Sequence, residues 1–341
     1  MSVKTITENL KTGNFSSLYY IYGDEEYLKQ HYYSELRLKT VTDLVEFNVI
    51  EFDSKNFDYT DFSNCVNSYP VMADRKFVGV TDFNNSLLTS DFQKKFVEFL
   101  KTIPEFCTVV FYDTEFKKTS GKNKLEQAVA QAGGVVASVD KPSAAGLMSW
   151  CARHFKKAGK TISADDLNYM LSITDTDMRS LVNEISKLCS YVSEETVTRE
   201  HIDAVVVRSI EANRYEIASA FASSDYQKVF DIVDKMYKQN VEEILIVGTF
   251  YYAFVDLWKT KLATDCGRPS ADIVNGLGVN QFAVRNALRN SKNLDRRFLA
   301  ECIEASLELD ARLKSIQCNK RDMITAYIAD LVSRRRKLAK A

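Results

Sequence analysis

The sequence predicts an α/β domain with a mainly parallel sheet, followed by a remainder that is wholly helical. Short apolar segments alternate with helical patterns over residues 17–141, which is typical of βα units. The segment Lys141-Pro142-Ser143 interrupts this alternation, and no convincing strand is expected after it. A chain of 341 residues is also too long for one ordinary core. We therefore expect an α/β domain over 1–141, a small helical domain over 142–209 and a helical bundle over 210–341.

Short apolar runs between helices indicate strands that are buried on both faces of a parallel sheet. The predicted strands are Ser17–Tyr22, Phe47–Phe52, Lys76–Val80, Cys107–Tyr112 and Gly134–Val139. The helices predicted between them are Glu25–Lys39, Tyr59–Ser68, Asp91–Lys101 and Lys122–Ala132. Pro70 disfavours helix at the residue before it, so the second of these helices is expected to end near Ser68.

The second part of the chain shows helical periodicity throughout. The small helical domain is predicted to contain Ala144–Lys157, Ser163–Ile173, Asp177–Tyr191 and Thr198–Arg208. The bundle is predicted to contain Tyr215–Ala222, Tyr226–Gln239, Glu242–Thr264, Ala271–Asn275, Gln281–Arg289, Arg296–Leu313 and Arg321–Lys337. Gly159 fits a helix stop, and the Ser163–Asp166 segment fits a capping box at the start of the next helix.

The composition is that of a soluble globular protein, with 45% hydrophobic and 27% charged residues and a net charge of −1. The sequence contains neither a long apolar run nor a signal-peptide pattern, so we expect a cytoplasmic protein that has no membrane partner. Seven cysteines occur without C-x-x-C spacing, which favours free thiols over disulfides or a zinc site. Cys151 and His154 alone are too few ligands to predict a metal.

The turn after the first predicted strand is where a nucleotide-binding protein of this class would hold phosphate. A P-loop needs a second glycine, a lysine and a following hydroxyl. Here Gly23 is followed by three carboxylates (Asp24, Glu25 and Glu26), the second glycine is missing, and Lys29 precedes Gln30. Neither a catalytic triad motif nor a dinucleotide-binding fingerprint is present. We therefore expect no ATP hydrolysis, no cofactor and no catalytic activity.

Two apolar residues behind a proline stand out, because charges follow them immediately. Val71 and Met72 come after Pro70 and are followed by Asp74 and Arg75. The spacing alone allows two interpretations. The pair could pack beneath the next strand, as most apolar residues do, or it could form an exposed knob that binds another protein.

A second candidate site is a helix-turn-helix-like segment at 271–289. Two short helical patterns flank a glycine-containing corner, and Gln281, Arg285 and Arg289 lie on the second helix. This spacing would suit a DNA-binding regulator, although such corners are also common in helical bundles.

Several segments resemble, in order and over nearly the full length, the delta-subunit family of bacterial DNA polymerase III, in the clamp-loader branch of the AAA+ proteins. The segments are Leu18–Leu28, Met72–Val78, Gly133–Val136, Leu181–Leu188, Leu277–Val284 and Leu309–Lys314. The resemblance implies an AAA+-like α/β domain with a degenerate P-loop, a small helical lid domain and a C-terminal helical collar.

The resemblance also implies a function. The subunit would bind the beta sliding clamp and open its ring for loading onto primed DNA, while sibling subunits hydrolyse ATP. In this family, two apolar residues at the positions of Val71 and Met72 enter a pocket on the clamp, and Asp74 and Arg75 would fix the register. The implied partners are the clamp, the ATPase (gamma/tau) and delta-prime subunits, and primer-template DNA within the complex. With this resemblance, we favour the exposed-knob interpretation.

Overall fold

The computed structural model describes residues 2–55, 57–114, 123–268, 287–315 and 318–338. The chain forms two compact units, Met1–Ser149 and Trp150–Ala341, which are described separately here. The predicted boundary between a lid domain and a bundle at 209/210 stays a prediction. Among the described helices, none has both the length and the apolar composition of a membrane-spanning segment.

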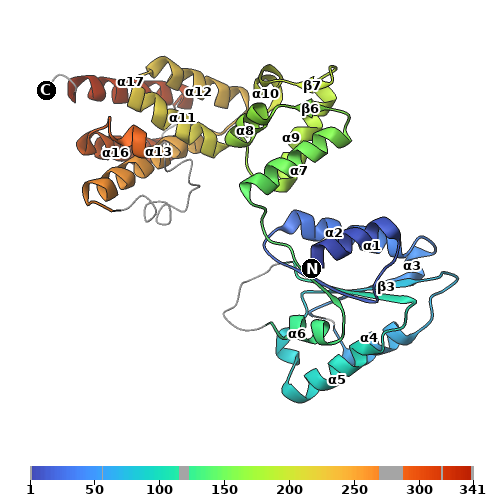
Figure 1. The fold of residues 1–341 in the computed structure, drawn as a ribbon. Helices are drawn as coiled ribbons and strands as arrows, with labels where there is room; N and C mark the ends of the chain where they lie inside the picture. Colours follow the sequence, from blue (N-terminus) through green and yellow to red (C-terminus); the bar gives the residue numbers. More distant parts are fainter. Residues whose placement is uncertain (1, 56, 115–122, 269–286, 316–317, 339–341) are drawn as a thin grey trace. The chain divides into compact units, whose positions relative to one another are not determined.

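The first unit is built on a five-stranded parallel sheet with the strand order β2-β3-β4-β1-β5 (Figure 1). Its strands are β1 (Leu18–Tyr22), β2 (Val49–Asp53), β3 (Lys76–Thr81), β4 (Cys107–Tyr112) and β5 (Val135–Ser138). The three central strands are almost fully buried, which explains their continuous apolar sequences. The predicted parallel sheet is therefore confirmed.

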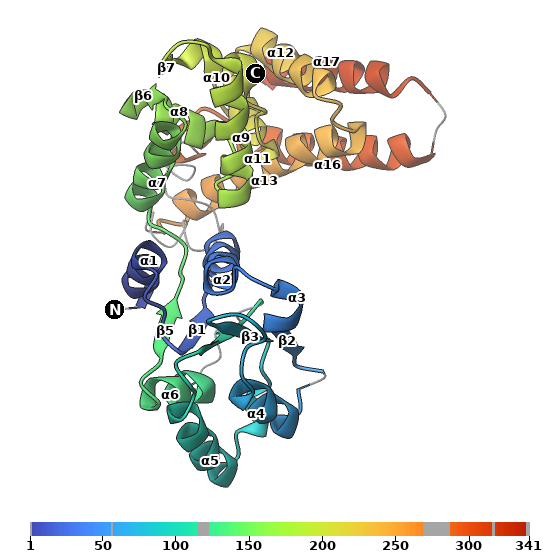
Figure 2. The same ribbon diagram turned by 90° about the vertical axis from the view of Figure 1, so that its right-hand side faces the viewer.

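Helices cover both faces of this sheet (Figures 1 and 2). On one face, α1 (Ser2–Thr12) and α2 (Glu26–Thr40) pack on the side chains of Tyr19 and Ile21. On the other face, α4 (Tyr59–Asn67), α5 (Ser90–Lys101) and α6 (Lys124–Gln131) enclose an aromatic core around Phe62, Phe96 and Phe111. Alternate residues of each strand thus enter different cores, as the pleat of a strand requires.

Two elements of this unit differ from the prediction. Helix α1 was not predicted, although Ile6 on it is fully buried against the sheet. The second strand was predicted to begin at Phe47, but residues 45–48 form a one-turn helix, α3 (Val45–Asn48), and β2 starts at Val49. The pattern of apolar and polar residues over only four positions does not distinguish a short helical turn from the start of a strand, because both contain apolar residues close together.

The second unit begins within α7 (Ala144–Lys157), which crosses the unit boundary. Helices α8 (Ala164–Ile173), α9 (Met178–Tyr191) and α10 (Arg199–Val205) follow, as predicted. The Ser163 hydroxyl accepts a hydrogen bond from the Asp166 amide at 3.0 Å, so Ser163 is the N-cap; of the predicted capping box, this is the half that the structure shows. The expectation of no further strands was wrong. Two-residue strands β6 (Thr161–Ile162) and β7 (Thr196–Val197) pair in parallel, but they are too short to give a strand pattern.

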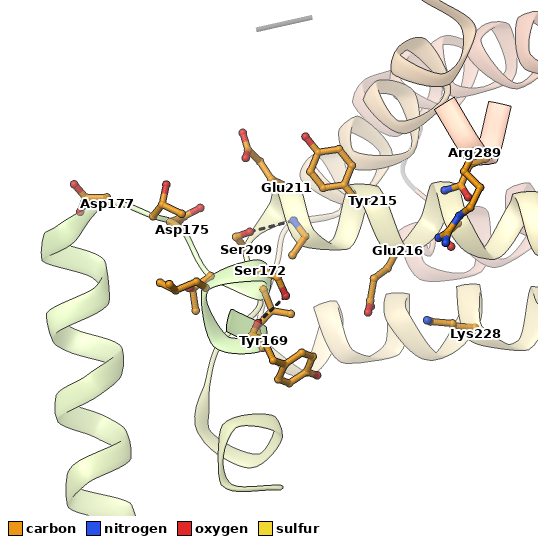
Figure 3. Close-up of a pocket in the computed structure, with 17 residues that line it drawn as sticks. Tyr169, Ser172, Asp175, Asp177, Ser209, Glu211, Tyr215, Glu216, Lys228 and Arg289 are labelled. Atoms are coloured by element: carbon orange, nitrogen blue, oxygen red, sulfur yellow. Dashed lines mark hydrogen bonds between the residues drawn. The ribbon is translucent and has the colours of Figure 1, made fainter. Parts of the chain in front are cut away.

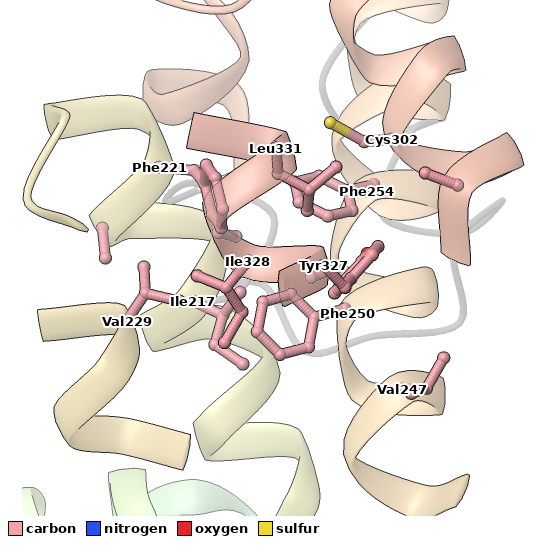
Figure 4. Close-up of a cluster of buried hydrophobic side chains, with 14 of the residues drawn as sticks. Ile217, Phe221, Val229, Val247, Phe250, Phe254, Cys302, Tyr327, Ile328 and Leu331 are labelled. Atoms are coloured by element: carbon pink, nitrogen blue, oxygen red, sulfur yellow. The ribbon is translucent and has the colours of Figure 1, made fainter. Parts of the chain in front are cut away.

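The remaining described helices form a bundle around a shared apolar core (Figure 4). They are α11 (Ile210–Ser223), α12 (Tyr226–Lys238), α13 (Glu243–Asp265), α16 (Arg296–Ser315) and α17 (Lys320–Leu338). Phe221, Phe250 and Phe254 meet at the centre and contact one another through their rings. Helix α11 begins five residues before the predicted start at Tyr215, because Ser209 caps it by accepting a hydrogen bond from the Ala212 amide.

Gly79 in β3 is required by a close approach of α2 to the sheet. A Cβ atom built on Gly79 would overlap the hydroxyl oxygen of Tyr33, a buried residue of α2. The Tyr33 hydroxyl donates a hydrogen bond to the Glu51 carboxylate at 3.3 Å, so the tyrosine ring is held in this position. Even one methyl group at residue 79 would therefore displace α2 or the tyrosine.

We predict that Gly79→Ala lowers the free energy of unfolding by about 1–3 kcal/mol, the usual cost of overpacking. Tyr33→Phe alone should cost about 1 kcal/mol through the lost hydrogen bond. In the double variant the alanine gains space, so the two costs should not add. Urea denaturation of the four proteins measures this coupling, and strictly additive effects would contradict the proposed overlap.

Candidate functional site

The predicted site residues lie at the amino-terminal edge of the sheet. Strands β2 and β3 are parallel neighbours, with Val49 opposite Phe77. The segments that enter these strands must therefore lie side by side. They are α3, which enters β2, and residues 68–75, here called the presenting loop, which enters β3.

The Asn48 side chain joins these two segments. Its amide nitrogen donates to the Val71 carbonyl oxygen at 2.9 Å, and its carbonyl oxygen accepts from the Val71 amide at 2.7 Å. The amide nitrogen also lies within 3.3 Å of the carbonyl oxygens of Asp43 and Leu44. Because Asn48 is fully buried, solvent cannot replace these hydrogen bonds when they break. The backbone of Val71 is therefore fixed to α3.

Lys76 anchors the presenting loop to the helix before it. Its buried ammonium donates to the Ser68 hydroxyl at 2.8 Å and to the Cys65 carbonyl oxygen in the last turn of α4. A cation at this position compensates the unpaired carbonyls and the dipole of a helix C-terminus. The chain therefore leaves α4 in a fixed direction before it reaches Pro70.

Arg75 and Tyr69 also hold the presenting loop against its own unit. The Arg75 guanidinium donates to the Phe15 carbonyl oxygen at 3.4 Å and to the Thr108 hydroxyl at 3.2 Å. The Tyr69 ring lies 4.9 Å from the Phe106 ring, centroid to centroid. Of the two charged residues expected to fix the register with a partner, the structure thus directs Arg75 inward, whereas Asp74 is exposed.

Val71 and Met72 lie at the exposed tip of this anchored loop. The exposed fraction is 47% for Val71 and 89% for Met72, so the interpretation that they pack beneath the next strand is wrong. Met72 has a left-handed backbone with φ of 48°, which is unfavourable for a residue other than glycine. The surrounding hydrogen bonds hold it there. The loop therefore presents two apolar side chains to solvent in a preformed conformation.

The turn after β1 lies at the opposite, carboxyl-terminal edge of the sheet. It supplies the carboxylate of Glu25 to the start of α2. Gly23 has a φ of 124° and approaches the Val139 backbone so closely that a Cβ atom would overlap it. The buried Glu25 side chain caps α2 and accepts a hydrogen bond from the Tyr27 amide at 3.2 Å. In a P-loop protein this helix start binds phosphate instead.

Lys29, which a P-loop protein would direct toward phosphate, is also bound within the unit. Its buried ammonium donates to the carbonyl oxygens of Asp113 at 2.8 Å and Thr114 at 3.0 Å, just after β4. Burial lowers the pKa of Lys29 below its ordinary value. Asp82 fixes the same strand end by accepting from both the amide and the hydroxyl of Thr114. The Glu25 and Lys29 side chains, which would face a nucleotide in a P-loop protein, therefore each bind backbone groups of this unit.

The second unit contains a polar cavity of about 590 Å³ between the 172–177 segment and α11 (Figure 3). Several of its polar groups already have structural partners. Glu216 accepts from the Arg208 guanidinium at 2.8 Å, Asp177 caps α9, and Ser209 caps α11. Among the described residues no group of three or more His, Cys, Asp or Glu side chains is placed to hold a metal ion.

Two other features of the second unit carry little of the site. Most of the helix-turn-helix-like segment at 271–289, including Gln281 and Arg285, lies outside the described residues. The basic end of α17 contacts its own bundle, since Arg334 pairs with Asp330 at 2.7 Å and the Arg335 and Arg336 guanidiniums lie over aromatic rings. These arginines therefore make structural contacts within the bundle.

Sequence patterns missed the residues that support the site. Asn48 was predicted within a strand, and Lys76 was taken only as the start of another. A polar residue in an apolar segment signals a buried hydrogen bond, but it does not identify the partner.

The comparisons with known proteins point to one family. A family model described as "DNA polymerase III, delta subunit" matches residues 19–137, and one described as "DNA polymerase III delta subunit, C-terminal domain" matches residues 211–331. DNA polymerase III subunit delta of Bacillus subtilis is 24% identical, and the alignment covers 97% of each chain. A probable subunit delta of Aquifex aeolicus is 22% identical over 78% of this chain and 77% of the relative.

A solved structure has the same fold over nearly the whole chain. It is titled as the Bacillus subtilis DNA clamp loader delta protein, and it matches with a TM-score of 0.72 and 22% identity. The match covers 97% of this chain and 99% of the other. This fold and the family models agree, and the two models together match more than two thirds of the chain. The chain therefore belongs to the family of delta subunits of DNA polymerase III.

Proposed function

We propose that this subunit of the DNA polymerase III clamp loader binds the beta sliding clamp through Val71 and Met72 and opens its ring. The observation that supports this proposal most directly is the pair of exposed apolar side chains on an anchored loop. Adjacent apolar side chains that are exposed on a protein surface mark a site of interaction with another protein.

The expected binding energy is large enough for a specific contact. Val71 and Met72 are 47% and 89% exposed, so burial of the area that is still exposed is worth about 2–4 kcal/mol together. The fixed loop reduces the entropy that is lost on binding, because its backbone is already ordered. Methionine is flexible, so Met72 adapts to the shape of a pocket that the more rigid Val71 enters beside it.

Ring opening requires only that the subunit binds the open clamp more tightly than the closed clamp. The population then shifts by the difference between the two binding free energies. A preformed protein surface is sufficient for this task, and no bond is made or broken by this chain.

The proposal assigns ATP binding and hydrolysis to other subunits. The Glu25 carboxylate occupies the helix start that would bind phosphate, and Lys29 is bound to backbone carbonyls. The gamma/tau and delta-prime subunits are the proposed partners, and the predicted collar at 210–341 is the proposed contact with them. Primer-template DNA would be bound within that complex, and the cytoplasm stays the predicted compartment.

We predict that Val71→Ser combined with Met72→Ser weakens binding to the organism's own beta clamp at least about 30-fold, because the lost burial is worth at least about 2 kcal/mol. Folding should be unchanged, since both side chains are exposed. Surface plasmon resonance with immobilised clamp measures the affinity, and circular dichroism checks the fold.

The matched control is Leu307→Ser, which changes an exposed apolar residue of α16 in the other unit (53% exposed). It should bind the clamp like the unmodified chain. Normal clamp binding by the Val71/Met72 variant would refute the proposal.

Asn48→Ala tests whether the fixed loop matters for binding. The variant leaves the Val71 amide and carbonyl without partners, so it should lose about 1–3 kcal/mol of stability. Clamp affinity, measured where the variant is fully folded, should fall by about fivefold or more, because the loop must then be ordered on binding. Unchanged affinity would show that the loop does not need Asn48 for presentation.

The purified chain should not hydrolyse ATP, and added ATP should leave its affinity for the clamp unchanged. A phosphate-release assay and the same binding assay measure both quantities. ATP turnover that is lost on Lys29→Met would instead identify an active nucleotide site.

A further inference from the structure

Helix α3 presents further apolar side chains beside the presenting loop. Phe47 is 61% exposed, and Leu44 and Val45 next to it are also exposed. Asn48, the last residue of the same helical turn, makes both hydrogen bonds to Val71. A buried amide thus links two segments that are distant in sequence and that each carry exposed apolar side chains. Such concentrations on a soluble protein mark interaction sites.

Backbone conformation supplies a second, independent observation. Leu44 has a φ of 46° and Met72 a φ of 48°, and both are left-handed residues without a glycine's freedom. Leu44 precedes α3, which carries Asn48, and Met72 directly follows Val71, to which Asn48 is bonded. Both side chains are exposed. Strain of this kind persists where the surrounding structure holds it, and it is found preferentially at binding sites.

The size of a protein interface connects α3 to the partner of Val71 and Met72. A specific interface covers about 800 Å² on each protein, a patch roughly 30 Å wide. The Asn48 side chain touches the Val71 backbone, so Phe47 lies well inside a patch of that width. A protein seated on Val71 and Met72 would therefore also cover α3.

The charges around this surface argue against a second copy of this chain as the occupant. Asp43, Glu46 and Asp74 are all exposed around the apolar residues. A symmetric contact between two copies would bring these carboxylates together, which is unfavourable. A different protein with a neutral or basic rim fits better.

We infer that Leu44, Val45, Phe47, Val71 and Met72 form one composite apolar surface, and that the ring bound by Val71 and Met72 also covers α3. This inference rests on the proposed clamp binding. It adds a second segment, α3, to the contact, with Phe47 as its largest anchor. Asn48 is the positioning residue that holds the two segments in register.

The test compares three variants in the clamp-binding assay: Phe47→Ser, Val71→Ser with Met72→Ser, and the control Leu307→Ser. We expect Phe47→Ser to weaken clamp binding about 10- to 30-fold, as for an aromatic interface anchor. Leu307→Ser should bind normally. Because Phe47 is exposed, its replacement should leave the unfolding midpoint unchanged.

A fourth variant, Leu44→Gly, separates binding from stability. Glycine relieves the left-handed strain, so the unfolding midpoint should equal or exceed that of the unmodified chain. Clamp binding should nevertheless weaken about fivefold, since the apolar side chain is gone. If Leu44 served only folding, Leu44→Gly would lower the unfolding midpoint and leave the clamp affinity unchanged.

The outcomes distinguish this inference from the proposed function. If the Val71/Met72 variant loses clamp binding while Phe47→Ser and Leu44→Gly bind normally, the composite surface is refuted and the proposed function stands. If the Val71/Met72 variant binds normally, the proposed function itself fails. Analytical ultracentrifugation measures self-association. If Phe47→Ser changes self-association and leaves the clamp affinity unchanged, α3 contacts a second copy of the chain and the inference is overturned.

Discussion

The candidate site depends on one pair of hydrogen bonds, between the Asn48 side chain and the backbone of Val71. A buried carboxamide offers a donor and an acceptor side by side, and it pairs with a backbone amide and carbonyl as a neighbouring strand would. This pairing continues the contact between β2 and β3 beyond the end of the sheet. It joins α3 to the presenting loop, although neither segment is a strand. Apolar residues that would otherwise collapse onto the core are thereby held in solvent.

The two edges of the parallel sheet differ in which groups they leave exposed. At the carboxyl-terminal edge, where α/β proteins usually bind ligands, Glu25 and Lys29 satisfy the helix start and the strand ends from within. At the amino-terminal edge, α3 and the presenting loop leave apolar side chains uncovered. The polar groups of one edge are thus satisfied from within, while the exposed apolar side chains lie at the other end of the strands.

The sequence was sufficient to predict the parallel sheet and most helices, because strand burial and helical periodicity are local signals. It also identified Val71 and Met72 as unusual, since charges follow them directly. It could not predict that Phe47 is exposed on α3, because its neighbours fit a strand equally well. Nor could it pair Asn48 with Val71, 23 residues away, since that contact exists only when β2 and β3 are adjacent. A hydrogen bond between one polar residue and a partner far away in the chain produces no periodic pattern in the sequence.

The Glu25 cap has a consequence for how such a subunit is controlled. A bound phosphate arrives and departs with the nucleotide, but a carboxylate on the chain stays at the helix start whatever the ATP concentration. Under the proposed function, the conformation of this domain does not follow the ATP level of the cell. On that proposal, the timing of clamp binding is set by neighbouring subunits that hydrolyse ATP and expose or cover the apolar surface of this one.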